Sequence, residues 1–154
     1  NVPYPDATFD FIWGEDAWCY IIDKDKLISE ASRILKPGGI IAFTDWIEGK
    51  TPLTEEEAMR INTFMKFPYM ETIDGYTRLL EKNGFEVKEN SEIPFAKYLD
   101  MYIDMLTEQY TYDALRIIGD DTELFAAMGA EMDFMRKKAH EGKMARGRFI
   151  GIKR

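Results

Sequence analysis

The apolar residues of this 154-residue chain alternate between two spacings, one typical of buried strands and one typical of amphipathic helices. Continuous apolar runs at Phe9–Trp13 and Ile40–Thr44 predict two strands, the first a central strand with neighbours covering both faces. Residues 23–35 carry apolar side chains at helical spacing, with Asp23 as the N-cap and a Lys-Pro-Gly-Gly stop at 36–39. This strand–helix–strand order predicts a right-handed parallel crossover.

The remaining chain continues the mixture of helices and strands. Thr54 and Glu57 have the spacing of a capping box, and Gly84 occupies the position after a helix that favours left-handed backbone. The predicted fold is a three-layer α/β fold in which a helical lobe precedes the last strand. Its further elements are helices at 54–66, 72–83, 95–112 and 122–140 and strands at 85–93 and 146–153.

Composition narrows the class of protein. Apolar residues make up 45% of the chain and charged residues 31%, values typical of a globular domain. A net charge of −8 argues against a nucleic-acid binder, and no apolar run approaches the ~20 residues of a membrane span, so we expect a cytoplasmic protein. The chain has one cysteine and one histidine, Cys19 and His140, which excludes an internal disulfide and a Cys/His zinc site.

Charge is distributed unevenly along the chain. Residues 136–154 carry a net +7, so the preceding residues carry −15. The basic end either contacts an acidic ligand or partner, or forms a solvated helix end and edge strand that neutralise an acidic body; we favour the second interpretation.

The two predicted strands end in residues suited to a binding site. Gly14, Glu15, Asp16 and Trp18 follow the first strand, and Asp45 and Trp46 follow the second. Because ligands of open α/β sheets bind beyond the carboxyl ends of the strands, these segments are expected to form one pocket rim. Trp18 and Trp46 are the better candidates for function, whereas Trp13 is expected to be core packing.

Each of these positions also has a purely structural interpretation. Gly14 either allows close approach of a ligand or is an ordinary turn glycine. Asp16 and Asp45 either orient an amine or cap a following turn. Cys19 is expected to be a small buried residue without a catalytic role.

Three segments together resemble the C-terminal half of a class I S-adenosylmethionine-dependent methyltransferase. They are VPYPDATFDFIW at 2–13, RILKPGG at 33–39, and the stretch from TIDGY at 72–76 to NGF at 83–85. Residues 14–18 and the helical insert before residues 142–149 are most similar to sarcosine/dimethylglycine-type small-molecule N-methyltransferases. The resemblance implies one partial domain over residues 1–154, with a lobe at 95–141 inserted before the final strand.

The resemblance also implies a cofactor and a reaction, namely S-adenosylmethionine and N-methylation of a small amine. It points to Gly14, Glu15 and Asp16 as cofactor contacts, and we add Trp18 at the same strand end. Aromatic walls and carboxylates suit such a reaction, so the expected substrate-binding residues are Tyr20, Asp45, Trp46 and Tyr69. No catalytic residue and no metal ligand is assigned.

One family feature is missing from this sequence. The glycine-rich loop after the family's first strand is absent, and Gly38 and Gly39 cannot replace it because they follow a helix and precede a strand. The chain is therefore expected to be inactive alone, its other half having been lost by proteolysis, truncation or gene splitting. The alternative is a non-catalytic assembly module that self-associates through the exposed edge of its first strand. A homodimer, or pairing with an N-terminal half, is expected.

Overall fold

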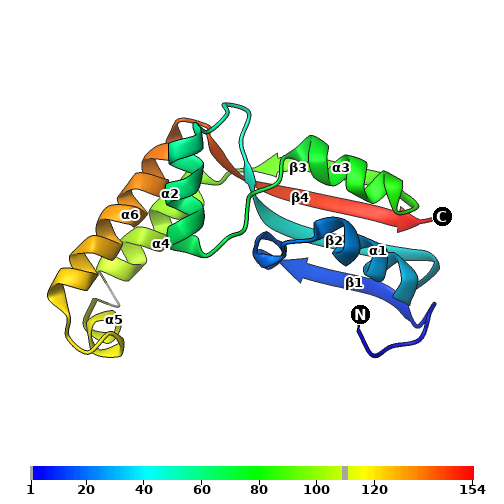
Figure 1. Ribbon diagram of the computed structural model, residues 1–154, viewed down its shortest axis with the longest axis horizontal. Coiled ribbons are helices and arrows are strands. Elements are labelled where there is room, and N and C mark those ends of the chain that lie inside the picture. The colour runs from blue at the N-terminus through cyan, green and yellow to red at the C-terminus, as the bar shows by residue number, and fades with distance from the viewer. Residues whose placement is uncertain (1, 109–110) are drawn as a thin grey trace.

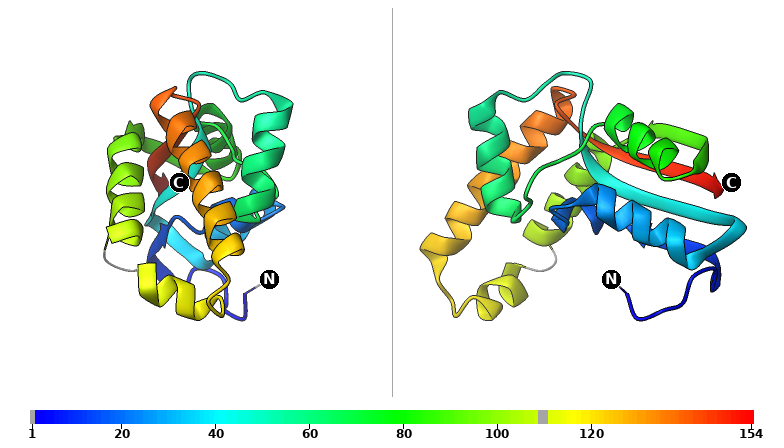
Figure 2. Two further views of the ribbon diagram at one scale, coloured as in Figure 1. Left: turned by 90° about the vertical axis from the view of Figure 1, so that its left-hand side faces the viewer. Right: turned by 45° about the vertical axis from the view of Figure 1, so that its right-hand side comes forward.

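The computed structural model describes residues 2–108 and 111–154, which form a twisted sheet with a helical lobe at one end (Figures 1 and 2). The strands are β1 (Phe9–Glu15), β2 (Leu35–Glu48), β3 (Phe85–Ile93) and β4 (Met144–Lys153). The helices are α1 (Lys24–Ile34), α2 (Glu55–Met65), α3 (Ile73–Lys82), α4 (Ala96–Glu108), α5 (Thr111–Ile117) and α6 (Thr122–His140), with a 3₁₀ turn, η1, at Trp18–Tyr20.

The sheet has the order β1-β2-β4-β3 and mixed strand directions. β1 and β2 are parallel, as predicted from the crossover, while β4 runs antiparallel to both of its neighbours. The α/β class and the placing of the helices before the last strand are confirmed. The last strand, however, is not the edge strand that was predicted, because it pairs with β2 on one side and β3 on the other.

The prediction that β1 is a central strand covered on both faces is wrong for this chain. β1 lies at the edge of the sheet, and within the described residues only β2 pairs with it. Phe11 is 51% exposed and Trp13 is 61% exposed, so Trp13 is not the core residue that we expected. Because α1 and α3 share a single core on one face of the sheet, the fold has two layers where three were predicted.

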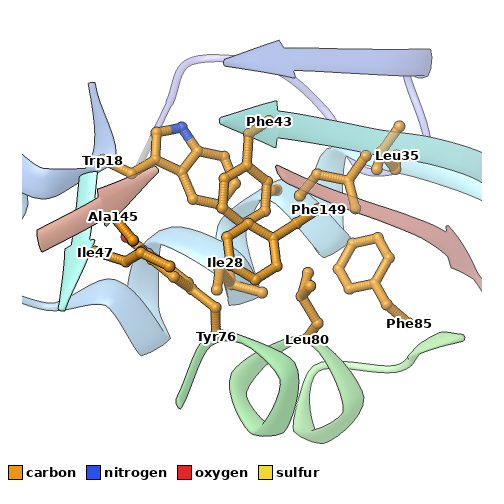
Figure 3. Close-up of a cluster of buried hydrophobic side chains, with 12 residues drawn as sticks. Trp18, Ile28, Leu35, Phe43, Ile47, Tyr76, Leu80, Phe85, Ala145 and Phe149 are labelled. Carbon is orange, nitrogen blue, oxygen red and sulfur yellow. The ribbon is translucent and has the colours of Figure 1, made fainter. Parts of the chain in front are cut away.

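The main core lies between the sheet and the helices α1 and α3 (Figure 3). Phe43 occupies its centre and stacks on Trp18 and Phe149, with ring centroids 3.9 and 4.8 Å away. Tyr76 packs against both phenylalanines from α3, at 5.2 and 5.1 Å. These rings connect the end of β1, through Trp18, to β2, α3 and β4.

Helix starts were the best-predicted feature of the chain. Asp23 caps α1, Thr72 caps α3 and Asp121 caps α6, each through a side-chain oxygen that accepts a backbone N–H. Thr54 and Glu57 form the reciprocal capping box at the start of α2. Of the helix predicted at 95–112, residues 96–108 form α4 and residues 111–112 begin α5, while residues 109–110 lie outside the described residues.

The helical lobe has a second core of its own, which joins the sheet at the carboxyl ends of β1 and β2. Cys19 from the η1 turn is fully buried in this core among side chains of the lobe. Glu57 of α2 lies 2.7 Å from Lys138 and 2.6 Å from Lys143, which ties the start of α2 to the end of α6. The lobe is thus anchored at the end of the sheet where the site was predicted.

Candidate functional site at the ends of two parallel strands

The segment after β1 and the last residues of β2 meet at one end of the sheet, as the sequence predicted. Both strands run further than predicted, however, so Gly14 and Glu15 belong to β1, and Asp45 and Trp46 belong to β2. The backbone N–H of Asp16 donates to the carbonyl of Thr44, at 2.9 Å. The N–H of Cys19 donates to Oδ1 of Asp45, also at 2.9 Å. The arrowhead of β1 points toward the helical lobe, so these segments face it (Figure 1).

Trp18 lies inside the core beneath this strand end. Its side chain is only 8% exposed and stacks on Phe43. This packing explains why position 14 is a glycine, because a Cβ at that position would lie 2.7 Å from Nε1 of Trp18. Trp18 and Gly14 therefore have a structural role in this chain, and their contact with a cofactor stays a prediction.

Asp45 is a fully buried carboxylate that holds the η1 turn on the end of β2. Besides the Cys19 N–H, it accepts a hydrogen bond from the Tyr76 hydroxyl, 2.6 Å from Oδ2. Burial raises the pKa of Asp45, and the bonds from Tyr76 and Cys19 oppose that rise because they favour the ionised form. Its contact with a substrate stays a prediction.

Tyr69 faces a buried lysine. The ammonium of Lys24, which is 1% exposed, lies 3.7 Å from the centroid of the Tyr69 ring and donates to the Tyr69 carbonyl at 3.2 Å. Burial lowers the pKa of Lys24. The predicted role of Tyr69 in substrate binding is untested, and the ring already has a cationic partner from the chain itself.

Arg146 on β4 is the residue of this site that sequence reasoning missed. Its Nε donates to Oδ1 of Asp16 at 2.9 Å, and its Nη2 donates to Glu15 at 3.0 Å and to Thr44 at 3.1 Å. Its side chain is 13% exposed, so this member of the basic C-terminal segment is not a solvated charge. The alternating pattern of the last strand was the available signal, but only strand pairing brings Arg146 beside Trp46.

A cavity of about 630 Å³ opens between this strand end and the helical lobe. Three predicted site residues line it, namely Asp16, Tyr20 and Trp46. Phe67 lies between the two aromatic ones, 5.0 Å from the Tyr20 ring and 5.8 Å from Trp46 between centroids. The other walls come from α2, α4, α5 and α6, which contribute mainly apolar side chains.

The described residues do not form a complete site for a nucleotide-type cofactor. The connection from β1 to α1, residues 16–23, contains no glycine, and Gly14 near the end of β1 is packed against Trp18. Glu15 and Asp16 can contribute one wall, but no glycine-rich loop leads from a strand into a helix in the described chain. No cluster of metal-ligating side chains occurs in residues 2–108 and 111–154, and no helix there is long and apolar enough to cross a membrane.

Comparison with known proteins identifies the fold. A family model described as a methyltransferase domain matches residues 1–43. The crystal structure of a putative sarcosine dimethylglycine methyltransferase from Galdieria sulphuraria superposes on 99% of this chain with a TM-score of 0.84 and 23% identity. The chain has the fold of part of this methyltransferase. It resembles the sarcosine/dimethylglycine N-methyltransferases, as the sequence motifs predicted.

Other similar proteins show how much of such a protein this chain corresponds to. The sarcosine/dimethylglycine N-methyltransferase of Halorhodospira halochloris is 42% identical over 45 residues, 29% of this chain and 16% of that protein. The geranyl diphosphate C-methyltransferase of Streptomyces coelicolor A3(2), solved with geranyl diphosphate and S-adenosyl-L-homocysteine, matches the whole chain with a TM-score of 0.72 and 14% identity. The chain covers 56% of the Galdieria structure and 51% of the Streptomyces one, about half of each.

Proposed function

We propose that this methyltransferase domain transfers a methyl group from S-adenosylmethionine to the nitrogen of a small-molecule amine, and that the chain supplies the acceptor side of the site. One observation carries the proposal: Asp16 from the end of β1 and Trp46 from the end of β2 line the same cavity. The 42% identity to a sarcosine/dimethylglycine N-methyltransferase over 45 residues supports nitrogen as the acceptor atom.

The reaction needs orientation and exclusion of water more than it needs a nucleophilic side chain. The cofactor supplies an electrophilic methyl group, and the amine must present its lone pair in line with it. Holding the two in that geometry lowers the barrier by up to ~7–11 kcal/mol. In this chain, Asp16 accepts a hydrogen bond from an amine N–H, while Tyr20 and Trp46 enclose the amine and keep water out.

Arg146 positions the carboxylates for this task. Because it binds Asp16 and Glu15 together, it holds both at the mouth and leaves the trio with one net negative charge. That charge favours an amine over an anion at the cavity entrance. Glu15 and Asp16 also form the wall nearest the cofactor. The rest of the cofactor is held by a segment that corresponds to the half of the relatives that this chain does not cover.

The test is to supply that segment from a relative. The region of the Halorhodospira halochloris protein that precedes its match to this chain is joined to residue 1, and transfer of tritiated methyl groups to a panel of amines is measured. We expect transfer, together with a raised KM for the amine in Asp16→Asn. Asp10→Asn, in which the exposed carboxylate lies on the same strand and pairs with Lys36, is the matched control and retains the parent KM.

The proposal fails if the chimera is monodisperse and binds S-adenosylhomocysteine by calorimetry but methylates no amine. It also fails if Asp16→Asn and Asp10→Asn behave alike. Calorimetry with the 154-residue chain alone is expected to show no heat with S-adenosylhomocysteine.

A second candidate function, an assembly module, is favoured by the edge of β1. This edge exposes the unpaired side of a strand together with Phe11 and Trp13, a combination that invites pairing with another chain. Analytical ultracentrifugation of the chain and of Trp13→Glu tests it. A dimer that Trp13→Glu dissociates, combined with an inactive chimera, would favour the module over the enzyme.

A further inference from the structure

The cavity beside the strand ends is large and apolar. Its volume of about 630 Å³ lies in the usual range for drug-sized ligands and would hold roughly 20 water molecules at liquid density. Leu106 of α4 and Phe125 and Met132 of α6 are typical of its walls. An amino acid such as dimethylglycine would fill a small part of this space and leave the apolar walls in contact with water.

The charges on the cavity wall are of one sign. Asp16 and Asp133 are its only charged members among the described residues, and no lysine, arginine or histidine lines it. Each is paired with a guanidinium outside the lining: Arg146 binds Asp16, and Arg136 binds Asp133 at 2.5 Å. A ligand carboxylate would therefore find no cation on the wall, and the two guanidinium groups beside it are already bound to Asp16 and Asp133, so an anion would be poorly compensated there.

The three predicted site residues of the wall lie at one end of the cavity. Asp16, Tyr20 and Trp46 lie at the sheet end, whereas the far wall includes Ile117 and Phe125, from α5 and α6 in the lobe. The lobe extends away from the sheet (Figure 1), so the cavity runs from an acidic, aromatic end at the sheet to walls that are mainly apolar in the lobe. This arrangement matches a molecule with an amine at one end and a hydrocarbon or aromatic body at the other.

We propose that the acceptor is a lipophilic amine without a carboxylate, with its nitrogen at Asp16 and its apolar body between α4 and α6. This assignment rests on the proposed methyl transfer for its biological meaning, but binding of such an amine does not depend on the cofactor. It distinguishes this chain from the relatives whose names specify sarcosine and dimethylglycine as substrates.

Gly129 of α6 allows the cavity to be filled without damage to the fold. It lines the cavity, and a Cβ built on it meets no other atom within 4 Å. In a helix, leucine is favoured over glycine, so Gly129→Leu is expected to retain or raise the Tm. Ala130, the next residue of α6, is exposed and does not line the cavity, so Ala130→Leu is the matched control.

The probes are N,N-dimethylalkylamines with ethyl, butyl and octyl chains, titrated calorimetrically into the 154-residue chain without cofactor. Since each buried methylene tightens binding by up to about fourfold, we expect at least a twofold gain per methylene along the series. Adding a terminal carboxylate to the octyl probe is expected to weaken binding at least about tenfold. Gly129→Leu is expected to weaken binding of the octyl probe about tenfold, and Ala130→Leu to leave it unchanged.

Three results would overturn the assignment. They are an affinity independent of alkyl length, equal effects of Gly129→Leu and Ala130→Leu, and a dimer in the ultracentrifuge that excludes the probe because a second copy covers the cavity. Failure of the methylation proposal is distinguishable: the chain would bind the octyl probe as expected, while the chimera would methylate no amine. Conversely, a chimera that methylates dimethylglycine, with a chain that binds no alkylamine, would refute this inference alone.

Discussion

Replacing Tyr76 with phenylalanine tests the buried carboxylate that holds the two strand ends together. The Tyr76 hydroxyl donates to Oδ2 of Asp45 at 2.6 Å, and both residues are fully buried. Phenylalanine preserves the ring contacts with Phe43 and Phe149 and removes only the hydroxyl. The variant therefore isolates one hydrogen bond to a buried carboxylate.

The expected loss of stability in Tyr76→Phe follows from the charge of the hydrogen-bond acceptor, Asp45. A hydrogen bond to an ionised group contributes ~1.5–3 kcal/mol, because losing it leaves a buried charge less well solvated. For a domain of this size, where 1 kcal/mol corresponds to about 2–4 °C, Tyr76→Phe is expected to lower the Tm by about 3–12 °C at pH 7.

The loss of stability caused by Tyr76→Phe should increase as the pH rises. Burial raises the pKa of Asp45 in the folded chain above its unfolded value of about 4, so its contribution to stability is complete below pH ~4 and is lost as the pH rises through the folded pKa. The Tyr76 hydroxyl lowers that folded pKa. Removing it raises the folded pKa further, so the stability difference between wild type and variant should grow from pH 4 upward.

Urea unfolding monitored by tryptophan fluorescence between pH 4 and pH 8 measures this difference. Tyr112→Phe is the matched control, since Tyr112 is 88% exposed and its substitution should change the free energy of unfolding by less than about 0.5 kcal/mol. A Tyr76→Phe effect as small as that of the control, or one that shrinks as the pH rises, would refute the reasoning.

Two further substitutions test the strand end and the lobe. Gly14→Ala places a methyl group 2.7 Å from Nε1 of Trp18 and should destabilise the chain by ~1–3 kcal/mol in urea unfolding. Lys138 and Lys143 hold the pKa of Glu57 down to about 2, so its contribution to stability is present above pH ~4.5 and lost as the pH falls toward 2. Glu57→Gln should therefore flatten the dependence of Tm on pH between 2 and 5.

Each of these has its own control. Gly129→Ala, at a helical position with open space around the new methyl group, should be neutral or stabilising, so a loss equal to that of Gly14→Ala would contradict the steric explanation. Glu55→Gln alters an exposed carboxylate in the same first turn of α2. If it changed the pH profile as much as Glu57→Gln, the ion pairs with the two lysines would not be the cause.

The sequence by itself determined where the helices begin and how the first two strands are connected. Asp23 and Thr54 could be identified as caps, because a cap bonds to backbone only three residues away, whereas the sequence left the cap of α6 open between Asp121 and Thr122. The parallel crossover followed from the order of the elements and the handedness of the polypeptide. The shared position of Asp16 and Asp45 followed in turn, since parallel strands bring their carboxyl ends to one edge.

Only the tertiary structure decided what each of those residues touches. An apolar strand has the same local pattern whether or not a second neighbour is present, so the exposure of Trp13 and the burial of Trp18 could not be predicted from spacing. Arg146 reaches Asp16 across 130 positions of sequence, through strand pairing that no local signal encodes. The cavity likewise exists because separate helices leave space between side chains, and packing over long range is a property of the folded chain as a whole.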